Sequence, residues 1–246
     1  MNPSQYLDHN TPIVVLQGYL NAKKLLKPSE QILRVEKPGE GNMNVVLRVI
    51  TNIRSFIIKQ SRPYEQKYQQ IEAPVNRIGV EYLFYDTVQS KALNAHIPEI
   101  IAYDSEDHLL ILEDLGHCED LTTIYEIRKV SNYLLEKLVK ALQLIHQSKL
   151  PANFPDNLMM RQLNHQHIFE LPFLKDNGFP LDDIQNGLQE LSLTIKTNES
   201  LKKTVKEVGE KYLSKGTTLL HGDFYPGSWM TANENLYIID PEFGFA

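Results

Sequence analysis

The last thirty residues of the chain, 217–246, read TTLLHGDFYPGSWMTANENLYIIDPEFGFA. They contain two short apolar segments, which we predict to be neighbouring strands, and each leads into a loop with carboxylates. Leu219 and Leu220 precede the loop with Asp223, and the segment 237–239 precedes the loop with Asp240 and Glu242. Acids from two adjacent strands can converge on a metal–phosphate centre. Phosphoryl transfer needs little more than a positioned acceptor hydroxyl and cations that neutralise the phosphates. Three unrelated acids in surface turns are the alternative.

Composition and charge argue against several other classes of function. The chain has 246 residues, 42% of them hydrophobic and 23% charged, which is typical of a globular protein with a sizeable core. A net charge of −6 argues against a nucleic-acid or membrane-surface partner. Cys118 is the only cysteine, so no intrachain disulfide is possible and a reducing compartment is expected. Neither a signal peptide nor an apolar run of about 18 residues is present, and we expect a cytoplasmic protein.

The first half of the chain has the pattern of a small sheet with two helices. Helical spacing of apolar residues predicts helices over 11–26 and 75–93. Between them, 31–60 contains three β-branched runs separated by turn residues, which indicates an antiparallel meander. The runs 97–103 (IPEIIAY) and 109–115 (LLILEDL) add two strands. We therefore predict a five-stranded antiparallel sheet within residues 1–115.

The second half is mainly helical. The segment 131–149 has one apolar face and opens with Ser131, a candidate helix cap. A looser stretch covers 151–180, and 181–214 predicts one or two amphipathic helices before the final strand pair. The fold class is therefore α+β, with a β-rich lobe over 1–115 and a mainly helical lobe over 116–246.

Two features of the first half are candidate phosphate ligands. Gly39 and Gly41 lie in a loop between two strands, where glycine lets backbone N–H groups approach a phosphate, although a plain hairpin turn has the same pattern. Lys59 lies in an apolar strand, and a buried lysine needs a partner charge. Glu81 on the following helix is the natural partner; an edge-strand lysine in water is the alternative.

Taken in order, these motifs resemble the aminoglycoside phosphotransferase and choline kinase superfamily of small-molecule kinases. Within it they are most similar to the methylthioribose kinases. The loop 39–44 (GEGNMN) is similar to their GDGNLN phosphate loop, 58–64 (IKQSRPY) to their VKQ-x-x-PY segment, and 240–243 (DPEF) to their acid motif. Most of the superfamily has an asparagine at the position of Ser228. The methylthioribose kinases have a Gly-Ser pair there, as this chain does at Gly227 and Ser228.

This resemblance implies a protein-kinase-like two-lobed fold, with ATP and Mg²⁺ as cofactors and a small-molecule substrate. It assigns the catalytic base to Asp223 and the metal ligands to Asp240 and Glu242. The nucleotide-binding positions that it implies are Gly39, Gly41, Asn42 and Asn44 over the phosphates, Lys59 on the phosphates with Glu81 as its partner, and Glu113 to Leu115 as the hinge.

The implied function is transfer of the γ-phosphate of ATP to a sugar hydroxyl, with 5-methylthioribose, a methionine-salvage metabolite, as the first candidate. The alternatives are a kinase of another small alcohol (an aminoglycoside, choline or homoserine) and a non-catalytic nucleotide-binding module. Members of the family continue well beyond the DPEF motif, so we expect a C-terminally truncated chain with an incomplete helical lobe. A homodimer is compatible with the sequence.

Overall fold

The computed structural model describes residues 5–39, 41, 43–89, 96–233 and 235–246. The chain forms two compact units, 1–155 with 217–246 and 156–216, called here the first and the second unit. The predicted lobe boundary after residue 115 lies inside the first unit and stays a prediction. None of the helices in the described part of the chain is long and apolar enough to cross a membrane.

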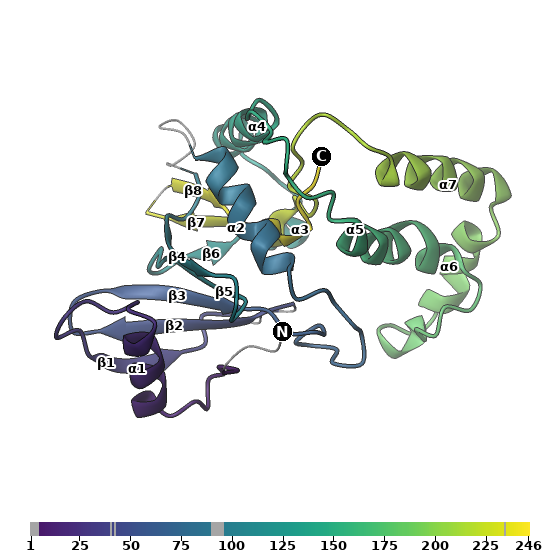
Figure 1. Cartoon of the computed structure of the whole chain (residues 1–246). Coiled ribbons are helices and arrows are strands. Elements are labelled where there is room, and N and C mark those ends of the chain that lie inside the picture. Colours follow the sequence, from purple (N-terminus) through teal and green to yellow (C-terminus); the bar gives the residue numbers. More distant parts are fainter. Residues whose placement is uncertain (1–4, 40, 42, 90–95, 234) are drawn as a thin grey trace. The chain divides into compact units, whose positions relative to one another are not determined.

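The first unit contains the predicted five-stranded sheet (Figure 1). Its neighbouring strands are all antiparallel, and their order is β1-β2-β3-β5-β4. The strands are β1 (Ile32–Glu36), β2 (Val45–Thr51), β3 (Ser55–Gln60), β4 (Ile100–Asp104) and β5 (Leu109–Glu113). The α+β class and the antiparallel sheet are confirmed.

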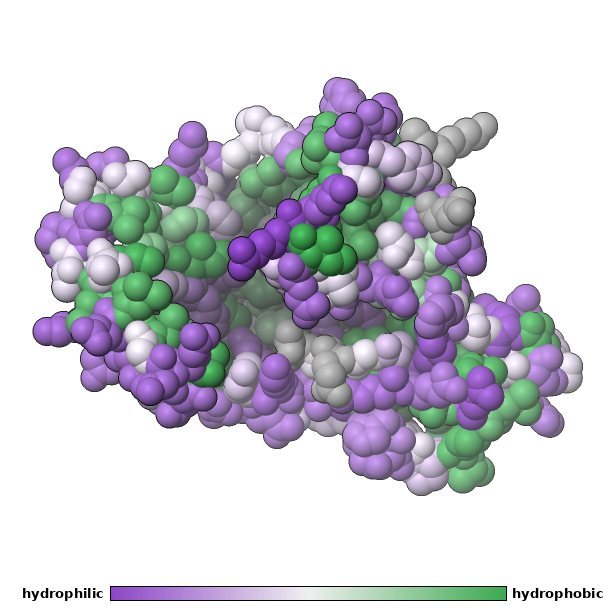
Figure 2. Space-filling model, turned by 180° about the vertical axis from the view of Figure 1, so that it is seen from behind, coloured by the Kyte–Doolittle hydropathy of each residue, from purple (hydrophilic) through white to green (hydrophobic). Residues whose placement is uncertain are grey.

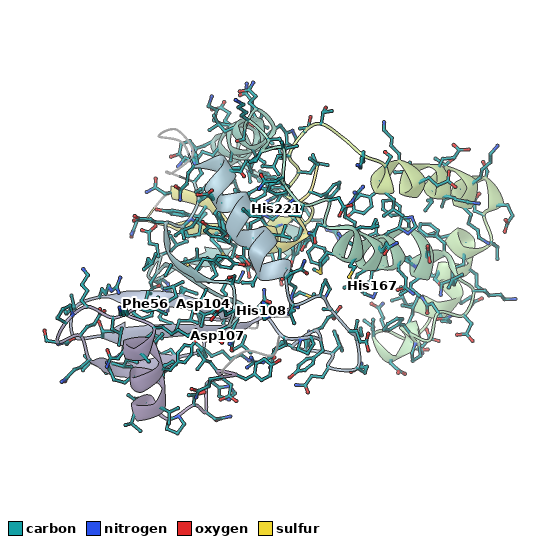
Figure 3. The ribbon with its side chains drawn as sticks, viewed as in Figure 1. Phe56, Asp104, Asp107, His108, His167 and His221 are labelled. Atoms are coloured by element: carbon teal, nitrogen blue, oxygen red, sulfur yellow. The ribbon has the colours of Figure 1, made fainter. Side chains whose placement is uncertain are left out.

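The two faces of this sheet have different partners because side chains alternate along each strand. Leu47 of β2 and Ile58 of β3 belong to a buried cluster with α1 (Ile13–Ala22), which begins after Pro12. The helix is shorter than predicted because Lys24 takes a left-handed conformation, with φ of 58°. Asp107 lies on the α1 side of the sheet, where the hydroxyl of Tyr19 donates to its carboxylate at 2.7 Å (Figure 3).

The other face of the sheet packs against α2 (Arg77–Val88). Phe84 of α2, Leu110 of β5, Leu236 of β8 and Ile145 of α4 (Asn132–His146) belong to one buried cluster. Ser131 caps α4 as predicted, because its side chain accepts a hydrogen bond from the N–H of Leu134. A short helix, α3 (Ile124–Ile127), precedes α4.

Two segments of the last thirty residues belong to a second, three-stranded sheet. It consists of β6 (Glu119–Asp120), β7 (Trp229–Ala232) and β8 (Asn235–Ile238), in the order β6-β7-β8. The prediction of a strand at 219–220 is wrong: Leu220 forms an isolated bridge with Phe245, and the antiparallel pair is β7–β8. Leu220 therefore pairs with the segment just after the loop of Asp240 and Glu242, and not with a neighbouring strand.

The second unit is helical. It contains α5 (Leu158–His165), a π-helical turn (Gln166–Glu170), α6 (Leu188–Lys196) and α7 (Glu199–Leu213). Short 3₁₀ turns lie at Leu171–Phe173 and Leu181–Asp183. The prediction of one or two helices in 181–214 is confirmed, with two present, whereas α5 lies in the stretch 151–180, for which no helix was predicted.

Candidate active site

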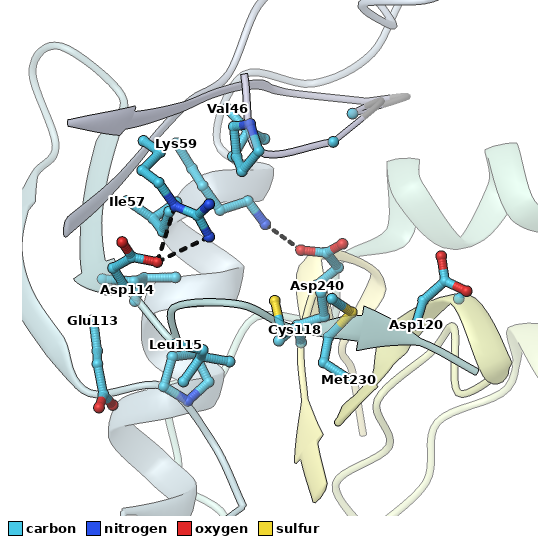
Figure 4. A pocket seen from close by; sticks show the side chains of 18 of the residues that line it. Val46, Ile57, Lys59, Glu113, Asp114, Leu115, Cys118, Asp120, Met230 and Asp240 are labelled. Carbon is cyan, nitrogen blue, oxygen red and sulfur yellow. Dashed lines mark hydrogen bonds and ion pairs between the residues drawn. The ribbon is translucent and has the colours of Figure 1, made fainter. Parts of the chain in front are cut away.

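A cavity of about 650 Å³ lies within the first unit, between the five-stranded sheet and the second sheet (Figure 4). Its size is in the range of small-molecule sites, and both polar and apolar side chains line it. The sheet contributes Val46, Ile57 and Lys59, the segment after β5 contributes residues 113–115, and the second sheet with its following loop contributes Met230, Ile239 and Asp240.

Lys59 is the charged centre of this cavity. It is buried, and its Nζ lies 2.6 Å from Oε1 of Glu81 and 2.6 Å from Oδ1 of Asp240. Burial opposes the charge on Lys59, but the carboxylates of Asp240 and Glu81 outweigh it and hold the pKa of Lys59 above its ordinary value. The lysine is therefore a fixed cation held between the side chains of Asp240 and Glu81.

Asp240 has an unusual backbone conformation that the site stabilises. Its φ of 61° and ψ of 48° are left-handed, which costs free energy for a residue with a Cβ. The N–H of Asp240 donates to the hydroxyl of Tyr85 at 3.2 Å, and its carboxylate accepts from Lys59. Tyr85 is almost completely buried on α2. Two elements of the first unit therefore hold Asp240 at the cavity wall.

The loop with Asp223 packs directly on the loop with Asp240. Gly222 has a φ of +83°, and a Cβ at this position would lie 2.0 Å from the carbonyl oxygen of Phe243. The fold therefore requires glycine at position 222, because of its left-handed backbone and because a Cβ would clash with Phe243. The 3₁₀ turn Pro241–Phe243 forms the second side of this contact.

His221 joins the same two loops through its ring. Its Nε2 lies 2.9 Å from the carbonyl of Ile239, and its Nδ1 accepts from the N–H of Asp223 at 3.3 Å. Burial lowers the pKa of His221 to about 4, so the ring is neutral and donates from Nε2. The ring packs edge-on against Phe84, beside α2 (Figure 3).

Asp223 has the charge properties of a group that can exchange a proton near neutral pH. Burial, and then the charge of Asp240, raise the pKa of Asp223 to about 6. Ser228, in the 3₁₀ turn Pro226–Ser228, donates from its hydroxyl to the carbonyl of Asp223 at 2.9 Å. A carboxylate with this pKa suits general-base chemistry.

Glu242 is buried in the first unit and does not line the cavity. Its Oε2 accepts from the side-chain amide of Asn44 at 2.8 Å and lies 3.3 Å from Nε of Arg77. Burial raises the pKa of Glu242, although Lys59 and Arg77 oppose that shift. Glu242 is thus an ion-pair partner inside the protein.

The carboxylates of Asp240 and Glu242 suit a hard cation such as Mg²⁺, which typically takes one or two carboxylates and completes its shell with phosphate oxygens and water. Within the described residues, no three His, Cys, Asp or Glu side chains are grouped closely enough to hold a metal by themselves. Asp240 and Glu242 offer two carboxylates, so such a cation would take the rest of its shell from phosphate oxygens and water.

The sequence-predicted site residues fall into three groups. Among those that line the cavity are Gly39, Gly41, Lys59, Glu113, Leu115 and Asp240. Asn44, Glu81, Asp223 and Glu242 are not among its lining residues. Asn42 lies outside the described residues. The side chain of Glu113 is directed away from Lys59 in Figure 4, and it accepts from the N–H of Glu99, so the backbone of residues 113–115 is what this segment offers a ligand.

Sequence reasoning missed an ion pair at the rim of the cavity. Asp114 accepts from Nε of Arg48 at 3.1 Å and from the N–H of Gly116 at 3.0 Å, as the dashed lines at Asp114 in Figure 4 mark for the arginine. Arg48 also donates to the carbonyl of Gly116 at 2.7 Å. The available signal was strand alternation, since Arg48 lies two residues after Val46 on the same face of β2.

Two buried residues of α2 were also missed. Arg77 and Tyr85 lie four residues before and after Glu81, so all three share one face of the helix. That face contacts the loop of Asp240 and Glu242. The four-residue spacing can be read from the sequence. The sequence does not show which element this face of the helix contacts.

Comparison with known proteins agrees with this geometry. A family model described as "Phosphotransferase enzyme family" matches residues 34–244. The chain belongs to this family. Among curated proteins, it is 25% identical over 229 residues to methylthioribose kinase 1 of Oryza sativa subsp. japonica, covering 87% of this chain and 52% of that protein. It is 26% identical over 247 residues to the methylthioribose kinase of Bacillus velezensis, covering 92% and 60%. The chain thus spans little more than half the length of these relatives.

Solved structures show the same fold at lower identity. Choline kinase LicA from Streptococcus pneumoniae has a TM-score of 0.52 at 16% identity, with 94% of this chain and 69% of that chain covered. Spectinomycin phosphotransferase APH(9)-Ia has a TM-score of 0.54 at 15% identity, with 93% and 69% covered. The family member described here therefore has the fold of these protein-kinase-like phosphotransferases.

Proposed function

We propose that the first unit binds ATP with Mg²⁺ and transfers the γ-phosphate to an alcohol hydroxyl of a small molecule. The observation that carries this proposal is the position of Lys59 at the cavity, 2.6 Å from both Glu81 and Asp240. The charge of Asp240 in turn raises the pKa of Asp223. A cation for the phosphates and a candidate metal ligand thus line one cavity. The candidate base is coupled to them through the charge of Asp240, an arrangement that suits phosphoryl transfer.

The groups that line the cavity suit a nucleotide. Val46, Ile57, Met230 and Ile239 offer apolar contact to a base, and the backbone of residues 113–115 offers hydrogen bonds to its edge. Gly39 and Gly41 line the cavity, and we assign their backbone to the phosphates of the nucleotide. Two structural neighbours support a nucleotide ligand, because LicA was solved with AMP and APH(9)-Ia with ADP.

The protein's own groups have separate tasks in this proposal. Lys59 holds phosphate oxygens, and the Asp223 carboxylate orients the acceptor hydroxyl and takes its proton. Asp240 and Glu242 would hold Mg²⁺, which neutralises phosphate charge when bound. The neutral ring of His221 keeps the Asp223 loop against the loop of Asp240.

The acceptor is proposed from the relatives. Methylthioribose kinases among them favour 5-methylthioribose as the first candidate. Choline and aminoglycoside-type alcohols follow from the names of the structural neighbours, and homoserine completes the panel. Because the chain spans little more than half of these relatives, binding of nucleotide without transfer is the competing outcome.

The test combines a nucleotide titration with a turnover assay over that acceptor panel. We expect Mg²⁺-dependent ATP binding, phosphate transfer to one acceptor, and a loss of at least about 100-fold in kcat for Asp223→Asn. Asp86→Asn, an exposed aspartate of α2, is the matched control and should keep full turnover. Unchanged turnover in Asp223→Asn would contradict the proposed role of this residue. Nucleotide binding without transfer to any acceptor would favour the non-catalytic module.

A further inference from the structure

Arg77 is a buried cation whose partners come from several segments of the first unit. Its side chain is fully buried, and a buried guanidinium needs acceptors for its donors. It donates to the carbonyl of Arg62 at 2.6 Å, that of Pro74 at 2.9 Å and that of Met43 at 2.6 Å. Its Nε lies 3.3 Å from Oε2 of Glu242. One side chain therefore joins three segments: the start of α2, the glycine-rich segment, which contains Gly41, Met43 and Asn44, and the acid loop, which contains Asp240 and Glu242.

A second, direct bond joins the glycine-rich segment to the acid loop. The side-chain amide of Asn44 donates to Oε2 of Glu242 at 2.8 Å, across 198 residues of sequence. A charged carboxylate only accepts, so the nitrogen of the amide must face it. Both Asn44 and Glu242 are buried, which makes such a hydrogen bond costly to leave unmade.

The same cluster reaches the cavity through Gly41. A Cβ at Gly41 would lie 2.7 Å from the carbonyl oxygen of Asn44, so the backbone of Gly41 packs closely on Asn44. Gly41 lines the cavity. A displacement of Asn44 would therefore move a residue that lines the cavity, and Glu242 is one of the groups that determine where Asn44 lies.

We propose that Asn44, Arg77 and Glu242 form a coupling cluster, which fixes the glycine-rich segment and the acid loop in one joint arrangement. Asn44 and Arg77 are positioning residues in this scheme: they act through Glu242 and need not contact the nucleotide. The consequence, which rests on the proposed function, is that Mg²⁺ and the phosphate-covering segment depend on each other for binding. Loss of either positioning residue should weaken the contribution of Mg²⁺ to ATP affinity and spare contacts to the base.

The first measurement compares three dissociation constants: ATP with Mg²⁺, ATP with a chelator, and adenosine. We expect Asn44→Ala and Arg77→Lys to reduce the tightening of ATP by Mg²⁺ about tenfold, with adenosine affinity unchanged within about twofold. Asn132→Ala, an exposed position on α4, is the matched control for asparagine. A general loss of structure would weaken adenosine and ATP together, and that result in Asn44→Ala would overturn the proposal.

A double-mutant cycle separates action through Glu242 from direct contact with phosphate. Glu242→Asp keeps the charge but shortens the side chain by one methylene, which withdraws the carboxylate from Asn44. If Asn44 acts through Glu242, Asn44→Ala costs about twofold or less in the Glu242→Asp background. Losses that multiply in the double variant would overturn the proposal. This cycle decides the question even if Arg77→Lys does not fold.

A urea-unfolding cycle on the ligand-free protein with the same Asn44 and Glu242 variants keeps the test independent of the proposed function. If the unaltered protein binds no ATP, the proposed function fails while the coupling cluster is still tested. Non-additive shifts of the unfolding midpoint would then support the contact, and additive shifts would overturn it.

Discussion

The two units of the chain bury different kinds of residue. The first unit has two clusters of buried apolar side chains, one under α1 and one around α2. In the second unit the buried residues are Met160, Arg161, Lys196 and Gly209. Apolar side chains of its helices are exposed instead, and Figure 2 shows apolar and hydrophilic residues interspersed over the surface.

This difference indicates which internal contacts stabilise each unit. In the first unit the acid loops are seated against the packed face of α2, through Phe84 and Tyr85. In the second unit a fully buried arginine joins two helices by hydrogen bonds to backbone carbonyls. Substitutions at these buried contacts of the first unit should therefore disturb the candidate site, whereas loss of the buried arginine in the second should act on local stability.

The largest effect is expected where the two acid loops touch. Gly222→Ala would place a methyl group 2.0 Å from the backbone oxygen of Phe243 in a left-handed conformation, and should lower the free energy of unfolding by about 3 kcal/mol or more. Nucleotide affinity should fall with it. Urea unfolding and a nucleotide titration measure both.

A glycine of the second unit provides the control for backbone strain. Gly178 has a φ of +76°, but a Cβ there would meet nothing within 4 Å. Gly178→Ala should therefore cost only about 1–2 kcal/mol, the cost of the left-handed conformation. Equal losses at the two glycines would show that the contact between the loops is not the cause.

The next effect concerns the polar connection of the second unit. Arg161 donates to the carbonyls of Tyr212 at 2.6 Å and Ser214 at 2.7 Å, at the end of α7. Arg161→Met leaves these acceptors without that donor, and we expect a loss of about 2–3 kcal/mol in the stability of α5 and α7. Hydrogen exchange of these helices measures it, and Lys203→Met, an exposed position of α7, is the control. A matching fall in nucleotide affinity would contradict the separation of the two units.

Local patterns in the sequence were sufficient for much of the fold. The sheet follows from β-branched runs between turn residues, and the cap at Ser131 needs only its own neighbours. Lys59 in an apolar strand required a partner, and the structure provides Glu81, as predicted, together with Asp240. Each of these predictions depends on alternation, on helical spacing or on the cost of burying one charge.

The remaining features depend on contacts between distant segments. Glu242 meets Asn44 across 198 residues, and no local pattern states that this acid is buried as an ion-pair partner. The strand predicted at 219–220 was wrong because Leu220 pairs with Phe245 instead. The rim pair of Arg48 and Asp114 also joins distant segments. Such contacts are decided by how elements pack, and single-sequence periodicity does not report that.

A smaller effect, on pH dependence, tests the electrostatics of the first unit. The pKa of Asp223 is raised to about 6, and the proposed base is its carboxylate. As pH falls below 6, kcat/KM should therefore fall about tenfold per unit. Stability should respond in the opposite sense: between pH 6 and 4 the folded state binds the additional proton, so protonation of Asp223 favours folding as pH falls. Asp223→Asn should remove this contribution, and a pH–stability curve unchanged by the substitution would contradict the assignment.

The smallest effect is expected on the exposed apolar face of the second unit. Leu191 on α6 is 65% exposed, whereas Leu138 on α4 of the first unit is 6% exposed. Leu191→Lys should change the free energy of unfolding by no more than about 0.5 kcal/mol, because the charge stays in water. Leu138→Lys should cost several times more, since it buries a charge in an apolar cluster. Urea unfolding of the two variants compares the same substitution on two helices. A cost above about 2 kcal/mol for Leu191→Lys would contradict this exposure and show that the apolar face is covered in solution.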